Sequence, residues 1–127
     1  MKIIGSFPKT RLRRIRKASW LRNLVSENNI SNNDLVLPIF VREGFNKIEP
    51  ILSMPGVNRY SVDKLPVIMD LVKYYKIPMI ALFPLTPNRK KNSRGSEALN
   101  KDNLVCKGLR LIKKKYPEIG VMCDVAL

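Results

Sequence analysis

The sequence contains no histidine, only two cysteines and a single tryptophan in 127 residues. Within these residues, the absence of histidine excludes histidine-based metal sites, Ser-His-Asp triads and imidazole acid–base chemistry. The cysteines, Cys106 and Cys123, lie far apart, and no apolar signal segment opens the chain. We therefore expect reduced thiols in a cytoplasmic protein. No apolar run approaches the roughly 18 residues of a membrane-spanning helix, so we expect no membrane association.

Acidic residues are also scarce, because 10 aspartates and glutamates stand against 24 lysines and arginines, which gives a formal net charge of +14. Such an excess favours an anionic partner, such as nucleic acid or a membrane surface. The basic residues are nevertheless spread over an N-terminal cluster at 11–17 (RLRRIRK), a loop at 89–94 and a helix end at 113–115. A helix dipole alone favours lysines in a last turn, so the charge is weak evidence for nucleic acid.

Three short apolar runs are present, at 35–41 (LVLPIFV), 79–84 (MIALFP) and 119–127 (IGVMCDVAL). Their spacing is typical of βα units, whose parallel strands are buried on both faces and therefore read as nearly continuous apolar runs. Three such strands cannot close a barrel, and a complete (β/α)₈ barrel takes about 250 residues. We predict an α/β fold that forms the first three βα units of a partial (β/α)₈ TIM barrel, the front of a larger enzyme.

The N-terminal segment precedes these runs. Residues 1–18 form an arm, and a short helix is predicted from Ser19, as its N-cap, to about residues 28–29. Residues 1–30 are thus expected to form an extended arm with a short helix. Residues 31–127 are expected to hold three strands and two crossover helices. Pro38 predicts an edge position or an irregularity in the first strand.

The segments between the runs provide the crossovers. Residues 42–61 lack clear periodicity, and so long a connection is expected to be functional or to contain a small hairpin. A first crossover helix is predicted over 64–76, with Pro66 in its first turn. A second is predicted over 101–115, with Asn100 as its N-cap. Its inward face is formed by Leu104, Val105, Gly108, Leu111 and Ile112.

Five segments occur in an order that points to one family: LVLPIFV, MPGVNRYS, IPMIALFPLTP, RGSEALN and VMCDVAL. From about residue 11 to residue 127, the chain resembles the N-terminal part of the porphobilinogen synthase family, also called 5-aminolevulinate dehydratase. The resemblance implies a (β/α)₈ barrel whose N-terminal arm wraps a neighbouring subunit of a homo-oligomer, commonly an octamer. It also implies a lyase that condenses two 5-aminolevulinate molecules to porphobilinogen, in haem and other tetrapyrrole biosynthesis.

In that family, lysines form Schiff bases with the substrate. A reactive amine must be deprotonated, and desolvation beside another cation lowers its pKa. None of the three apolar runs contains a lysine. We therefore expect the catalytic lysines to lie beyond residue 127, and the chain to be a truncated N-terminal fragment that is inactive alone.

Asp124 is the single acid in the last apolar run, where a barrel strand would deliver a functional side chain. By resemblance it matches the family's active-site aspartate, and it is the candidate catalytic residue. The alternative is a carboxylate that backbone hydrogen bonds satisfy at a strand end. Strand alternation predicts that Cys123 faces away from Asp124, and both Cys123 and Cys106 are expected to be structural.

The resemblance also bears on the metal. Family members with catalytic zinc have DVCLC where this chain has DVAL, so Ala126 stands at the first cysteine ligand and zinc is not expected. The resemblance implies the zinc-independent branch, in which magnesium is bound by ligands beyond residue 127, although Ala126 departs from the aspartate of that branch too. No cofactor-binding or metal-binding residue is assigned within the chain.

Several alternatives stay open. The cluster at 11–17 can serve as an oligomer contact, a solvated segment or a nucleic-acid contact, and the last is disfavoured because interleaved aromatic residues are missing. The loop NRKKNSRGSEA can form a lid or a plain surface loop. Two other functions compete with the first: a basic RNA-binding module derived from a barrel fragment, and another Schiff-base barrel of the aldolase kind.

Overall fold

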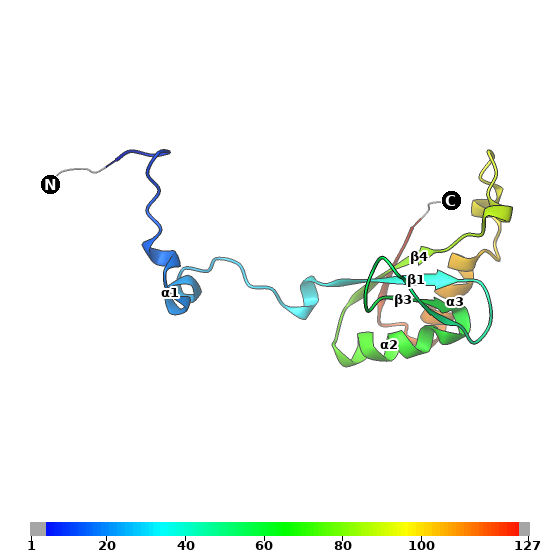
Figure 1. The fold of residues 1–127 in the computed structure, drawn as a ribbon. Coiled ribbons are helices and arrows are strands. Elements are labelled where there is room, and N and C mark those ends of the chain that lie inside the picture. Colours follow the sequence, from blue (N-terminus) through cyan, green and yellow to red (C-terminus); the bar gives the residue numbers. More distant parts are fainter. Residues whose placement is uncertain (1–4, 125–127) are drawn as a thin grey trace. The chain divides into compact units, whose positions relative to one another are not determined.

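The computed structural model describes residues 5–124 (Figure 1). The chain divides into two compact units, Met1–Ile30 and Ser31–Leu127. Among the described residues, no helix has the length and apolar character required to cross a membrane.

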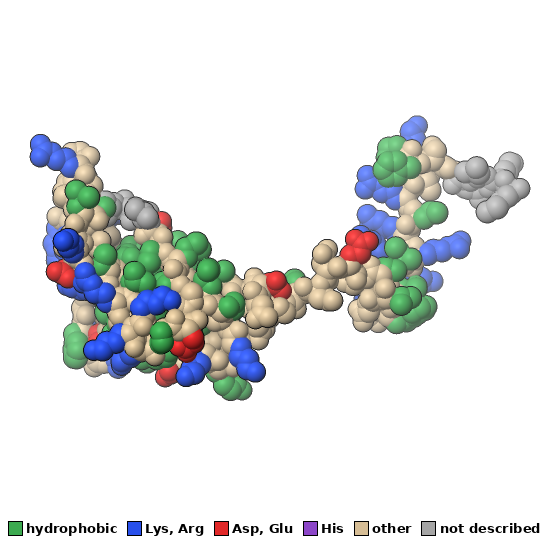
Figure 2. Space-filling view, turned by 180° about the vertical axis from the view of Figure 1, so that it is seen from behind, with side chains coloured by type: hydrophobic (Ala, Val, Ile, Leu, Met, Phe, Trp, Pro, Cys, Tyr) green, Lys and Arg blue, Asp and Glu red, His purple; other side chains and the backbone are tan. Residues whose placement is uncertain are grey.

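The first unit contains a short 3₁₀ turn, Arg14–Arg16, and the helix α1, Ser19–Leu24. Figure 2 shows many basic side chains along this unit. The predicted cap and end of α1 are wrong, because Ala18 is the N-cap and the helix ends at Leu24. No residue of α1 is buried. A helix this short is only marginally stable without packing, and no buried contact of the described residues stabilises further turns up to the predicted end.

The second unit is built on one five-stranded sheet. Its strands are β1 (Val36–Arg42), β2 (Ile48–Pro50), β3 (Asn58–Ser61), β4 (Met79–Pro84) and β5 (Gly120–Cys123), in the order β2-β3-β1-β4-β5. The pairs β3/β1, β1/β4 and β4/β5 are parallel, and β2/β3 is antiparallel. The described parts of the three apolar runs therefore contain adjacent parallel strands, as the sequence predicts, within a mixed α/β fold.

The long connection after β1 contains the small hairpin that was one of its two predicted forms. Strands β2 and β3 form this hairpin, and β3 also pairs in parallel with β1, which was not predicted. Ser61 is fully buried, and its hydroxyl accepts a hydrogen bond from Lys47 N (2.9 Å) and donates one to Lys47 O (3.1 Å). These strands are short, and neither forms a continuous apolar run, so a search for apolar runs does not find them.

Pro38 lies in β1 opposite Ala81 of β4. Strand β3 pairs with β1 from Phe40 to Arg42, so the position of Pro38 lies outside that pairing. The edge position predicted from Pro38 is therefore right locally, although β1 as a whole is an inner strand. A residue without an N–H group fits a position at which one neighbouring strand has ended.

Two helices connect the parallel strands. Helix α2, Leu65–Tyr74, has Pro66 in its first turn, as predicted. Helix α3, Leu104–Lys115, begins after Asn103, whose Oδ1 accepts a hydrogen bond from Cys106 N at 2.8 Å. The predicted cap, Asn100, is wrong because its Oδ1 accepts instead from Asp102 N (3.0 Å) in the turn before the helix.

Both helices pack on the same face of the sheet (Figure 1). The core between them consists of alternate residues of the strands and the inner sides of the helices: Ile39, Val41, Ile80, Leu82, Leu65, Met69, Val72 and Ile112. The other face, here called the open face, carries the intervening strand residues. Among them, Val36, Met79 and Met122 are exposed, and the rings of Phe40 and Phe83 lie 5.6 Å apart. The helices thus cover one face of the sheet within the described residues.

Candidate functional site

The carboxyl ends of β1, β4 and β5 meet at one edge of the sheet because the three strands are parallel. Glu43 directly follows β1, and Asp124 directly follows β5. The N–H of Asp124 donates to the carbonyl oxygen of Leu82 at 3.1 Å, so this residue continues the ladder just beyond the strand. In open α/β sheets, ligands bind outside the carboxyl ends of the strands. This edge is therefore the candidate functional site.

A pocket of about 160 Å³ lies at this edge. Its lining combines apolar groups with three carboxylates and one amide: Glu43, Pro84, Thr86, Pro87, Glu97, Ala98, Asn103, Leu104, Val105, Cys123 and Asp124. The residues come from the ends of all three strands, from the connection after β4 and from the first turn of α3. Ligand pockets commonly combine an apolar lining with a few convergent polar groups.

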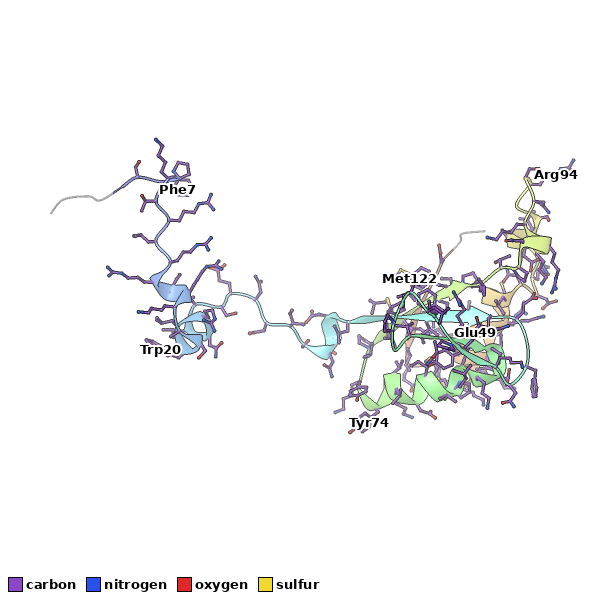
Figure 3. All side chains as sticks on the ribbon, in the orientation of Figure 1. Phe7, Trp20, Glu49, Tyr74, Arg94 and Met122 are labelled. Atoms are coloured by element: carbon purple, nitrogen blue, oxygen red, sulfur yellow. The ribbon has the colours of Figure 1, made fainter. Side chains whose placement is uncertain are left out.

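The connection between β4 and α3, residues 85–103, forms one wall of the pocket and is here called the wall loop. Its start is fixed by the N–H of Leu85, which donates to Val41 O at 2.7 Å. At its tip, Asn92 Oδ1 accepts from Arg94 N (3.1 Å) and Ser96 N (3.2 Å). Gly95 there has a φ of 59°, which glycine adopts without strain. Arg94 is exposed at this tip (Figure 3).

An ion network connects the wall loop to β1. Lys90 Nζ lies 2.6 Å from Glu43 Oε1 and 3.2 Å from Glu97 Oε1. The other oxygen of Glu43 accepts from Arg89 Nη2 at 2.6 Å. The hydrogen bond from Lys90 lowers the pKa of Glu43, and the hydrogen bonds to Glu43 and Glu97 raise the pKa of Lys90. Both partners therefore stay charged at neutral pH.

No lysine of this edge is prepared for Schiff-base chemistry. None of the five strands that the structure describes contains a lysine. Lys90 lines the neighbouring groove beside Glu43, but its pKa is raised rather than lowered. A protonated ammonium group has no lone pair with which to attack a carbonyl carbon.

Asp124 and Cys123 both line the pocket. Cys123 packs against the core on the helix-covered face, and burial raises the pKa of its thiol. It lines the same pocket as Asp124, although alternation predicts that the two side chains face away from each other. Cys106 is likewise half-buried. The expectation for Ala126 and zinc lies outside the described residues.

The pocket carboxylates are the candidate metal ligands of this edge. Among residues 5–124, no three His, Cys, Asp or Glu side chains gather closely enough to hold a metal ion. Lys90 stands between two of the three carboxylates of the pocket and already pairs with both of them. These residues therefore do not fit a magnesium site, and no chemical step through a metal is derived from them.

Sequence reasoning missed Glu43, Glu97 and Asn103 as residues of this site. Glu43 carried a usable signal, because it follows a predicted buried strand just as Asp124 follows another, and carboxyl ends of parallel strands share one edge. Glu97 lies in the RGSEALN segment, which follows the predicted strand at 79–84. Asn103 gave no separate signal, because Asn100 was an equally good cap candidate.

A second ion cluster lies on the strands near the open face. Glu49 of β2 pairs with Arg42 of β1 and with Arg59 of β3, the latter at 3.2 Å. Figure 3 labels Glu49 among the strand side chains. The register places Arg59 beside Phe40, so charged residues adjoin the apolar part of this face. The cluster ties three neighbouring strands together.

Comparison with known sequences identifies relatives. The family model described as "Delta-aminolevulinic acid dehydratase" matches residues 9–127. The delta-aminolevulinic acid dehydratase of Bradyrhizobium diazoefficiens is 51% identical over 117 residues, which are 92% of this chain and 33% of the relative. That of Methanothermus sociabilis is 40% identical over 121 residues, 95% of this chain and 37% of the relative.

Comparison with solved structures gives the same result. The chain superposes with a TM-score of 0.80 and 33% sequence identity on delta-aminolevulinic acid dehydratase (porphobilinogen synthase) from Toxoplasma gondii, in complex with the reaction product porphobilinogen. The match covers 93% of this chain and 33% of that protein. The chain thus spans about a third of the length of the relatives it matches.

Proposed function

Because this chain belongs to the delta-aminolevulinic acid dehydratase family, we propose that it forms the first βα units of a (β/α)₈ barrel with an N-terminal arm. The whole protein would be a lyase that condenses two molecules of 5-aminolevulinate to porphobilinogen, in haem and other tetrapyrrole biosynthesis. Adjacent parallel strands with helices on one face support the barrel, because barrel strands turn their other face to the interior.

The observation that carries this proposal is the position of Asp124 after β5, at the edge where the carboxyl ends of three parallel strands meet. In barrel enzymes this edge holds the active site. We propose that Asp124 contacts the substrate there. Its carboxylate can accept a hydrogen bond or a proton from a substrate amine. The Schiff-base lysines would come from strands that the described residues do not include.

The oligomer, the metal and the location are parts of the same proposal. The exposed basic arm of residues 5–18 supports a role as a contact to another subunit. Magnesium rests on the family resemblance alone, and its ligands would lie outside the described residues. Two free cysteines support a cytoplasmic location, because reducing compartments keep thiols unpaired.

A chimera tests the catalytic proposal. The 117 residues of the Bradyrhizobium protein that match this chain would be replaced by the corresponding residues of this chain. We expect the chimera to convert 5-aminolevulinate to porphobilinogen, measured by the colour reaction of the pyrrole product. Residues 1–127 alone should form none, because their strands supply no lysine.

Substitution of Asp124 tests its role within the chimera. Asp124→Asn should lower kcat by at least roughly a hundredfold, as is typical when an acid–base group is lost. Asp102→Asn is the matched control. Asp102 is exposed, its carboxylate lies 2.8 Å from Arg110 Nη1, and it is not one of the residues that line the pocket. A folded chimera without activity would contradict the proposed reaction. Full activity of Asp124→Asn would contradict the catalytic role of this residue.

The arm is tested separately. Deletion of residues 1–30 from the chimera should lower its oligomeric state in analytical ultracentrifugation. Polyanion binding that falls steeply with added salt would instead favour the RNA-binding alternative, because salt competes with phosphate contacts.

A further inference from the structure

The wall loop reaches the pocket through two short elements with different anchors. The first, Asn88–Lys90, lies beside Glu43 at the end of β1. The second, Ser96–Leu99, supplies Glu97 and Ala98 to the pocket lining. The turn between them is closed by Asn92 and leaves Arg94 exposed at its tip (Figure 3). The position of the second element therefore depends on contacts at the base of the loop.

Lys90 is the side chain that joins the two anchors. Its ammonium nitrogen lies within hydrogen-bond distance of carboxylates from both sides, Glu43 and Glu97. Arg89 also reaches Glu43, but its side chain is 74% exposed, and Glu97 is not among its ion partners in the described part of the chain. The Lys90 side chain is 33% exposed and that of Glu97 is 13% exposed, so their pair is better shielded from solvent.

The same network continues into α3. The main-chain oxygen of Glu97 accepts a hydrogen bond from Asn103 Nδ2 at 3.4 Å. The other amide atom, Asn103 Oδ1, caps α3 by accepting from Cys106 N. Contacts thus run without a break from the end of β1, through Lys90 and Glu97, to the first turn of α3. That turn contributes Leu104 and Val105 to the pocket.

We propose that Lys90 is a positioning residue of the candidate site: by bridging Glu43 and Glu97 it holds the wall loop against the end of β1 and fixes the pocket that Asp124 and Cys123 also line. Without the charge of Lys90, the carboxylates of Glu43 and Glu97 would lie close together with no cation between them. Like charges at such separations repel, so the second element would move away from β1. The importance of this positioning for catalysis rests on the proposed function, but the positioning itself does not.

Cys123 gives a direct measurement of this wall. It lines the pocket and is half-buried, so its alkylation by N-ethylmaleimide depends on how closely the wall is held. Mass spectrometry distinguishes its adduct from that of Cys106. In the 127-residue chain, we expect Lys90→Met to accelerate labelling of Cys123 by about 1.5-fold to fivefold, the range for loss of a partly exposed ion pair.

An electrostatic side effect would act in the opposite direction. Removal of a positive charge near a thiol disfavours its thiolate, which slows alkylation. Acceleration by Lys90→Met therefore reports an opened wall. Lys91→Met is the matched control, because the adjacent Lys91 is exposed and takes part in none of the ion pairs that the structure describes. It should leave the labelling rate unchanged.

The conservative variant separates charge bridging from loop packing. Lys90→Arg keeps the charge and several donors, so it should restore most of the slow labelling. The positioning role is overturned by an unchanged rate in Lys90→Met. A Lys90→Arg protein that labels as fast as Lys90→Met would overturn it as well.

Amide hydrogen exchange provides a second measurement that requires no thiol. In Lys90→Met, amides of residues 96–106 should exchange faster, while those of Ile39 and Leu82 in the core strands keep their rates. Equal acceleration throughout the sheet would show that Lys90 acts on global stability, which contradicts the proposal. Neither measurement uses 5-aminolevulinate. An inactive chimera together with accelerated Cys123 labelling would therefore refute the proposed function and support the positioning role.

Discussion

The two faces of the sheet differ in how they are covered, although both carry apolar residues. On the helix-covered face, Ile80 and Leu82 of β4 are fully buried beneath α2 and α3. On the open face, Met79 of the same strand is 38% exposed and Met122 of β5 is 52% exposed. Apolar residues on both sides of one strand indicate that both faces are meant to be covered, as is the rule for parallel sheets.

The largest expected difference between the faces is in stability. Leu82→Ala should lower the free energy of unfolding by about 3 kcal/mol, because it removes buried methyl groups and leaves a cavity. Met122→Ala should change it by less than about 0.5 kcal/mol, because this side chain is already exposed. Urea unfolding followed by circular dichroism measures both. Similar losses for the two variants would mean that the open face is also packed in solution.

Tyr116 tests the contribution of a single hydrogen bond at the border of the helix-covered face. It is buried, and its hydroxyl lies 3.0 Å from Asp70 Oδ1, to which it donates. Tyr116→Phe should cost about 1 kcal/mol, the usual value for a lost hydrogen bond. Tyr74→Phe is the control, because Tyr74 is exposed at the end of α2 (Figure 3). An equal loss for both tyrosines would contradict the assignment.

The pH dependence of this tyrosine has a definite sign. Burial raises the pKa of Tyr116 above its usual value of 10.0, and the neighbouring Asp70 raises it further. The folded state therefore keeps the phenol proton at pH values at which the unfolded chain loses it, so stability declines as the pH rises above 10. Tyr116→Phe has no phenol proton to lose, so its free energy of unfolding should decline less than that of the original protein over this pH range. Urea unfolding at pH 8 and pH 11 measures it.

Gly108 tests how closely α3 approaches the covered face. A methyl group at this position would lie 3.5 Å from Leu65 Cδ1 and 3.8 Å from Leu82 Cδ1, which are ordinary contact distances. Gly108→Ala should therefore stabilise the protein by about 0.5–1 kcal/mol, because alanine favours the helix. Gly120→Ala is the contrast, since its methyl group would lie 3.3 Å from Pro78 O. A destabilised Gly108→Ala would show closer packing than the structure has.

The smallest expected change in stability concerns the open face itself. Met122→Lys should leave the free energy of unfolding within about 0.5 kcal/mol of its original value. It should nevertheless reduce binding of the dye ANS, because exposed apolar surface is what the dye detects. Val67→Lys on the solvent side of α2 is the matched control. Equal loss of dye binding in both variants would mean that the open face is not the main exposed apolar surface.

Both crossover helices were predictable because each is long enough to show its periodicity, and the three parallel strands were predictable because each lies in a nearly continuous apolar run. Helix α3, for example, buries Gly108 and Ile112 on the predicted face. Short elements that depend on their surroundings were not predictable. The strand β3 has four residues and is held by pairing with β1 and by the buried Ser61, neither of which is visible in a local pattern.

Some residues of the candidate site were predictable from the sequence, and others were not. The sequence placed Asp124 after a strand and the RGSEALN segment after the preceding strand, and the structure brings them to one pocket. The bridge between Glu43 and Glu97 was missed because these residues are far apart in sequence and show no ligand spacing. Their proximity depends on how residues 85–103 fold, and that connection has no periodic pattern.

The strand β2 has a consequence for how the sheet can grow. It consists of three residues and ends in Pro50, which has no N–H group to offer. Glu49 is engaged with two arginines. A further strand, from this polypeptide or from another, would find few donors there. The margin formed by β2 is therefore protected against edge-to-edge pairing with another polypeptide.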